Sequence, residues 1–234
     1  MSNLIDIVEK LKLNNDSKAS NRKEKYKFFP KTNKELKELI KKLIKDRGLS
    51  ADLNDIDVSE ITDMHYLFGY GINNIENIDI SKWDVYKVTN MSNMFTGCIN
   101  FNCDLSNWNT HAVTDMSNMF KNCTSFNSPL FHHTLSLTNA RSMFEGCINF
   151  NQDISDWNTR NLSNAEYMFK GCAKFNQDIS SWKLPNIKNI NWMFLSCSEF
   201  NQDLSKWRLN RKVNKCCTFL RCDKLDVIPT WYKK

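Results

Sequence analysis

The sequence predicts an α/β solenoid: a stack of about seven coils of about 25 residues, each pairing one short parallel strand with one short helix, behind an N-terminal helical cap. Two observations lead to this prediction. A phrase containing Met-Phe recurs every 24–27 residues between residues 68 and 219, and an amphipathic segment precedes the first repeat. Because one unit of this length cannot bury its own apolar face, neighbouring units must stack.

Equivalent positions of the repeats form columns of similar side chains. The phenylalanines that set the register are Phe68, Phe95, Phe120, Phe144, Phe169, Phe194 and Phe219. Three residues after each lies a cysteine, except after the first: Cys98, Cys123, Cys147, Cys172, Cys197 and Cys222. The phrase ends on Trp108, Trp157, Trp182 and Trp207. We expect the phenylalanines and thiols to be buried, and we favour partial burial of the tryptophans over an exposed stacking platform for sugars or bases.

Each coil is expected to contain two regular elements. The apolar residues Val88, Met91, Met94, Phe95 and Cys98 have the spacing of one helix face, which predicts a short helix. The stretch Asp-(Ile/Leu)-Ser-x-Trp is short and suits an extended segment. One strand and one helix per coil is the plan of leucine-rich repeats.

The segment before the repeats predicts a helix over residues 32–47. Thr32 and Glu35 form a capping box, and Gly48 follows the last helical residue. One face carries Leu36, Leu39, Ile40, Leu43 and Ile44. We therefore divide the chain into a basic, partly disordered arm (1–28), a capping helix (29–50) that covers the first coil, and the repeats (51–234).

The phrases FNQD(I/L)SxW and VTxMSxMFxxC resemble the BspA-like leucine-rich-repeat surface proteins, found in host-associated bacteria and some large viruses. The segment PKTNKELKELIKKLIKDRG resembles the helix that opens their repeat array, so the similarity runs from Phe29 to Leu225. The resemblance implies a curved solenoid used for adhesion or protein binding, without catalytic residues. That family is usually exported, and this chain departs from it in showing no export signal.

Charge and hydropathy limit the possible locations. Of the net charge of +6, residues 1–50 contribute 14 Lys and Arg against 7 Asp and Glu. The first residues do not resemble a signal peptide, and no apolar run is long enough to cross a membrane. Nine cysteines without an export signal favour reduced thiols. We expect a cytoplasmic or non-classically exported chain, whereas the family resemblance implies the cell surface.

Residues with catalytic or metal-binding chemistry form no recognisable site. The histidines at 65, 111, 132 and 133 lie in no nucleophile motif, and no Cys-x-x-Cys pair is present. The aspartates Asp104, Asp153, Asp178 and Asp203 form a column that we interpret as structural carboxylates bound by backbone N–H groups. His132 and His133 lie in a coil that is one residue short. They mark either a local bulge or an irregular contact with a partner. We expect no enzyme activity, no metal and no cofactor.

The predicted function is binding of a protein partner or adhesion, through residues that differ from coil to coil. The candidate stripe comprises the residues before each Trp: Lys82, Asn107, Asp156, Ser181 and Lys206. The alternative is binding of nucleic acid or an anionic surface through the basic arm, assisted by a basic C-terminal end with Arg208, Arg211, Lys212, Lys215, Arg221 and Lys224. The sequence leaves the partner and the oligomeric state open.

Overall fold

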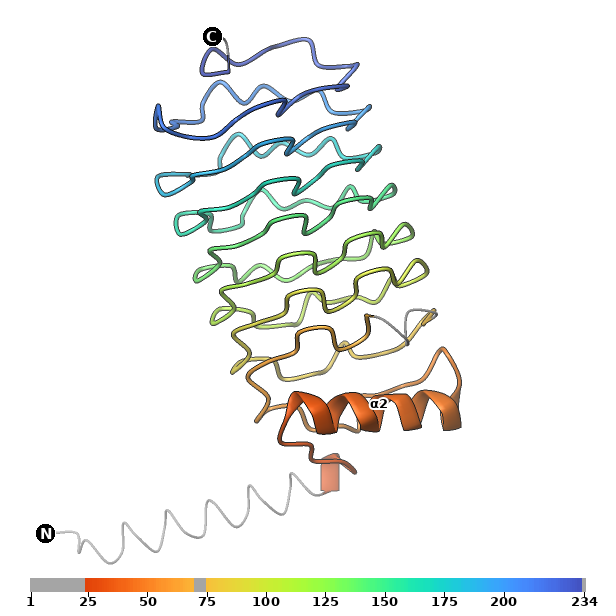
Figure 1. The fold of residues 1–234 in the computed structure, drawn as a ribbon. Coiled ribbons are helices and arrows are strands. Elements are labelled where there is room, and N and C mark those ends of the chain that lie inside the picture. The colour runs from red at the N-terminus through yellow and green to blue at the C-terminus, as the bar shows by residue number, and fades with distance from the viewer. Residues whose placement is uncertain (1–23, 70–74, 233–234) are drawn as a thin grey trace, which may run out of the picture.

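The chain winds into a stack of coils with one α-helix lying across its N-terminal end (Figure 1). The computed structural model describes residues 24–69 and 75–232, so the prediction of a disordered arm falls largely outside the described residues. Lys27 and Phe28, which the sequence placed in that arm, pair with the first coil: the N–H of Lys27 donates to the carbonyl of Asp55, and Phe28 forms a parallel bridge with Ile56.

The predicted α/β solenoid of strand-plus-helix coils is wrong. Within residues 24–69 and 75–232, helix α2 spans Asn33–Arg47, and no coil contains a strand or a helix of its own. Single-residue parallel bridges join the coils: one pairs Asp52 with Asp79, and the others form one column, Asp63, Asn90, Asp115, Asn139, Asn164, Asn189 and Asn214. Most of each coil consists of turns.

The segments expected to be helices are successions of tight turns. The N–H of Met94 donates to the carbonyl of Met91 at 3.2 Å, and the N–H of Cys98 donates to that of Phe95 at 2.9 Å. The third residue of each turn is left-handed, with φ of 58° at Asn93 and 76° at Gly97. Repeated four-residue turns give apolar residues a helix-like spacing, but a left-handed residue in every turn prevents a helix.

Alternate peptide groups of these turns point along the stack. The N–H of Met64 donates to the carbonyl of Asn90 at 2.8 Å, and the N–H of Met91, in the same peptide group as that carbonyl, donates to Asp115 at 2.9 Å. Four such columns run through the coils. Because every carbonyl in them faces the N-terminal end and every N–H faces the C-terminal end, their dipoles add as they do in a helix.

The core is built from continuous files of stacked rings. The phenylalanine column is fully buried up to Phe194 and has centroid separations from 5.2 Å, between Phe68 and Phe95, to 5.7 Å, between Phe144 and Phe169. A second file runs beside it: Phe101, Phe126, Phe150, Phe175 and Phe200. Ring stacking of this kind adds to the stabilisation from apolar burial.

The tryptophan column also belongs to the core. Trp108 is 1% exposed, and its Nε1–H donates to the carbonyl of Ile80 in the preceding coil at 3.1 Å. Trp182 and Trp207 repeat this arrangement with carbonyls one coil earlier. In the short coil Phe131 takes the tryptophan's place and stacks on Trp157 at 5.7 Å. A buried column with satisfied N–H groups is not a surface platform for sugars or bases.

Helix α2 begins and ends as its sequence predicts. The Thr32 hydroxyl oxygen accepts the N–H of Glu35 at 3.2 Å, while the Glu35 carboxylate accepts the N–H of Lys31 instead of that of Thr32. Gly48, with φ of 90°, ends the helix by donating to the carbonyl of Ile44. The buried face comprises Leu36, Ile40, Leu43 and Ile44, with Leu39 partly buried beside them.

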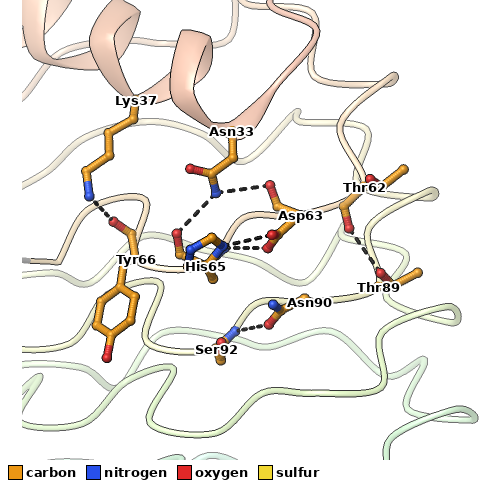
Figure 2. Close-up of polar contacts among 9 residues, drawn as sticks. All are labelled: Asn33, Lys37, Thr62, Asp63, His65, Tyr66, Thr89, Asn90 and Ser92. Atoms are coloured by element: carbon orange, nitrogen blue, oxygen red, sulfur yellow. Dashed lines mark hydrogen bonds and ion pairs between the residues drawn. The ribbon is translucent and has the colours of Figure 1, made fainter.

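Polar side chains of α2 cover the exposed carbonyls of the first coil (Figure 2). The Asn33 amide donates to the carbonyls of Asp63 and His65, both at 3.1 Å. In later coils the equivalent carbonyls, such as those of Asn90 and Ser92, accept N–H groups from the preceding coil. The Lys37 ammonium donates to the carbonyl of Tyr66 at 2.8 Å. Asn33 therefore caps the carbonyl end of two peptide columns, and the positive charge of Lys37 lies near that negative end.

The left-handed positions predict paired mutational effects. Gly97→Ala is expected to lower the free energy of unfolding by about 1–2 kcal/mol, because a Cβ there has open space but φ is 76°. Ser196→Gly, at the equivalent position with φ of 62°, should raise it by a smaller amount, because glycine makes the unfolded chain more flexible. Urea unfolding of both variants measures the signs, and equal signs would contradict this account.

Candidate interaction surface

The candidate stripe lies on the surface directly outside the tryptophan column. All five of its residues are exposed, and each precedes a buried ring of that column: Lys82, Asn107, Asp156, Ser181 and Lys206. The short coil interrupts it, because Leu130, which precedes Phe131, is buried. His132 fills the interruption, with its Nδ1 at 2.6 Å from Asp156 Oδ2. The irregular coil is therefore tied to the stripe.

An aspartate in each of these turns holds the backbone next to the stripe. Asp153 Oδ1 accepts the N–H of Ser155 at 2.9 Å, and Asp178 accepts that of Ser180 in the same way. These hydrogen bonds lower the pKa values of both carboxyl groups. Asp79, Asp104 and Asp203 repeat the contact. The prediction of structural carboxylates bound to backbone N–H groups is confirmed.

An asparagine ladder fixes the coil spacing on the same side of the repeats. The side-chain oxygen of Asn127 accepts the backbone N–H of Asn151 at 2.8 Å, and that of Asn151 accepts the N–H of Asn176 at 2.9 Å. The Gln177 amide adds donors to the carbonyl and side-chain oxygens of Asn151. Stripe residues of successive coils are consequently held in register by side chains as well as by backbone.

A second surface, on the turn segments, carries charges that compensate one another. Glu145 accepts hydrogen bonds from Lys121 at 2.9 Å and Lys170 at 3.0 Å. Burial alone would raise the pKa of Glu145, but these two ammonium groups outweigh it and lower that pKa. Arg141 pairs with Glu166. Sequence reasoning missed this cluster, although opposite charges recur there one repeat apart.

The cysteine column consists of buried packing residues. Each thiol donates to the carbonyl of a phenylalanine in the preceding coil, for example Cys147 to Phe120 at 2.9 Å. Burial raises the pKa of Cys98 to about 12 and holds that of Cys172 well above its ordinary value. Such thiols are protonated and shielded, which makes them poor nucleophiles. The prediction of small buried thiols is confirmed.

The histidines are dispersed along the stack. His65 contacts the carboxylate of Asp63, two residues away, and His132 contacts that of Asp156 in the next coil, while His111 packs its ring at 4.2 Å from that of Tyr86. In the part of the chain that the structure describes, no group of three or more His, Cys, Asp or Glu side chains converges as a metal site. The described residues also include no helix long and apolar enough to span a membrane.

Comparison with known families places the chain. The model of a family described as Mycoplasma protein of unknown function, DUF285, matches residues 34–137 and again residues 131–229. The chain belongs to this family. The two matches of the DUF285 model meet in the short coil and together take in α2 and nearly all of the repeats.

Other comparisons add little to the DUF285 assignment. No curated protein matches the sequence. Among solved structures, one similar chain is that in the crystal structure of the TLR13-ssRNA13 complex, with 12% identity and a TM-score of 0.26. The alignment covers 72% of this chain and 34% of that one, so the chain spans about a third of its length. A TM-score this low supports no conclusion about fold or ligand.

Proposed function

We propose that this DUF285 chain is a non-catalytic module that binds a protein partner through the stripe Lys82, Asn107, Asp156, Ser181 and Lys206. The observation that carries the proposal is the contrast between neighbouring positions. Each stripe residue is exposed and differs in charge or size from coil to coil, while the buried ring beside it hardly varies. A fixed scaffold with varied exposed side chains is how repeat proteins build a binding face.

Charge distribution also favours the stripe over the turn surface. On the turn surface, Glu145 is engaged by two lysines and Glu166 by an arginine. On the stripe, Lys82 and Lys206 lie at opposite ends, and Asp156, which contacts His132, lies between them. Mixed charges along an exposed line provide specificity for a protein surface of complementary pattern. Adhesion, which the resemblance to BspA-like proteins implies, is one form that such binding could take.

The basic C-terminal end gives weaker support to nucleic-acid binding. Lys224 pairs with Glu199, and the Lys215 ammonium donates to the carbonyl of Trp231, so two of the six cations are engaged within the chain. The remaining four are Arg208, Arg211, Lys212 and Arg221. The first 23 residues of the basic arm lie outside the described residues.

Photo-crosslinking with matched charge reversals tests the proposal. A photoreactive side chain at Asn107 or Ser181 of the full chain should capture a specific partner from cell extract, and protease should destroy the captured species. Adding Lys82→Glu and Lys206→Glu should reduce capture about tenfold, because both charges at the ends of the stripe are reversed. The control, Lys42→Glu with Lys174→Glu, makes the same charge change at exposed positions of α2 and another surface.

Three results would overturn the proposal. The first is equal loss of capture in both charge-reversal proteins, and the second is capture at the stripe that neither protein reduces. The third is a captured species that nuclease removes and protease does not, which would favour the nucleic-acid alternative. A steep fall of capture with rising salt in all proteins would accompany that third result.

A further inference from the structure

The last coil places two thiols side by side at the surface. Cys216 and Cys217 stand where earlier coils have residues such as Asn191 and Trp192, and their Sγ atoms are 3.1 Å apart. Cys217 occupies the left-handed turn position, with φ of 55°.

The pair differs from the cysteine column in its surroundings. Cys216 is exposed and Cys217 is partly exposed, whereas Cys172 and Cys197 are fully buried and bonded to carbonyls. Cys217 also lines a hollow of about 210 Å³ with Phe219, Leu220, Cys222, Leu225, Ile228 and Tyr232. A small molecule can therefore approach this pair, while the column thiols from Cys98 to Cys197 are shielded by packing.

We propose that Cys216 and Cys217 form a thiol–disulfide exchange site that reacts with low-molecular-weight disulfides and closes into a disulfide between the adjacent residues. The Cys216 thiolate, the more exposed, attacks one sulfur of the small disulfide, whose S–S bond breaks and releases one thiolate. The Cys217 thiolate then attacks Cys216 Sγ and displaces the second thiolate. The two protons lost by the cysteines pass to the leaving thiolates, so the pair is oxidised by two electrons and the small disulfide is reduced to two thiols.

Hydrogen bonds hold the backbone around the pair in place. The N–H of Cys216 donates to Asn191 Oδ1 at 2.6 Å, and its carbonyl accepts the N–H of Trp192 at 2.9 Å. The N–H of Leu220 donates to the carbonyl of Cys217 at 3.2 Å. Bond formation needs the sulfurs to approach by about 1 Å, which side-chain rotation can supply. The product closes a small ring between neighbours only about 3.8 Å apart at Cα, so it is strained and easily reduced again.

Mass spectrometry of one peptide tests the site. The native full chain is incubated with oxidised glutathione, the remaining thiols are alkylated in denaturant, and trypsin is added. Cleavage after Lys215 and Arg221 releases residues 216–221, which contain this pair and no other cysteine. We expect that peptide to lose two hydrogens and to carry no alkyl group or glutathione, at a rate at least about tenfold that of oxidation of any column thiol from Cys98 to Cys197.

The substitution Cys217→Ser and the native thiol of Cys103 separate exchange from simple exposure. Cys217→Ser should stop at the mixed disulfide and retain glutathione on Cys216, whereas partly exposed Cys103, a matched lone thiol, should show at most slow mixed-disulfide formation. Thermal unfolding of each variant checks that the coil is intact. Two outcomes would overturn the proposal. One is recovery of peptide 216–221 with both thiols alkylated, and the other is a chain without substitutions that retains glutathione as Cys217→Ser does.

Discussion

Replacing Phe144 with alanine is expected to lower the free energy of unfolding by about 3–5 kcal/mol. Phe144 is fully buried, and its ring centroid lies 5.5 Å from that of Phe120, 5.7 Å from that of Phe169 and 4.1 Å from that of Phe150. The substitution leaves a cavity between stacked rings that the hydrogen-bonded coils cannot close, because their spacing is set by backbone columns on both sides. Urea unfolding followed by tryptophan fluorescence measures the loss.

The same substitution at the end of the column is the control. Phe219 is 9% exposed and has a coil of the repeat on one side only, with Trp231 and Tyr232 on the other. Phe219→Ala should therefore cost less than Phe144→Ala. Because each coil contacts chiefly its neighbours, the central cavity should also broaden the transition by uncoupling the two halves of the stack. Equal losses with equally sharp transitions would show that the coils are not coupled in this way.

The sequence predicts the register of the core because burial is a local and repeated requirement. Each coil needs the same large ring, small thiol and tryptophan facing inward, and these positions recur at fixed spacing. The ends of α2 were also predictable, since Thr32 and Gly48 act within a few residues of the helix termini. The stripe could be selected because it is the variable neighbour of a constant column.

Apolar spacing alone could not show that the coils lack the predicted strand and helix. Residues three and four apart face one way in a helix, but they also do so in a series of turns whose third residue is left-handed. The signal that distinguishes the two was present as Asn93, Gly97, Asn118, Asn122 and Gly146, because Asn and Gly tolerate positive φ. In other coils Tyr167 and Trp192 occupy the same position and hide that signal.

The side-chain contacts between coils could not be predicted from the sequence for a different reason. The ion pairs of Glu145 link residues about one repeat apart, and whether such residues meet depends on the pitch of the stack. That pitch is set mainly by backbone hydrogen bonds that no residue type specifies, with the asparagine ladder adding to them. The short distance between the Sγ atoms of Cys216 and Cys217 was also beyond prediction, because it depends on a turn conformation that the preceding coils share.

Placing aspartates on the buried face of α2, as Leu36→Asp with Ile40→Asp, is expected to detach the helix and make the protein aggregate. Both side chains are fully buried, and covering one such residue contributes about 1.5–3 kcal/mol, to which the cost of a buried charge is added. Detachment exposes Leu53 and Ile56 together with the carbonyls of Asp63 and His65, a combination that other chains can pair with. Light scattering and gel filtration measure the result, and deletion of residues 32–47 should give the same one.

The control places two aspartates on the exposed face of the helix, as Lys34→Asp with Lys42→Asp, and should remain monomeric although its net charge changes more. The two ends of the stack make this prediction specific to α2. At the C-terminal end Trp231 stacks on Trp207 at 5.7 Å and Phe219 packs against Tyr232, so aromatic rings cover the last coil. At the N-terminal end the exposed peptide groups are carbonyls, which need donors such as Asn33 and Lys37 as well as apolar cover. A soluble, monomeric deletion protein with unchanged melting would contradict the capping role.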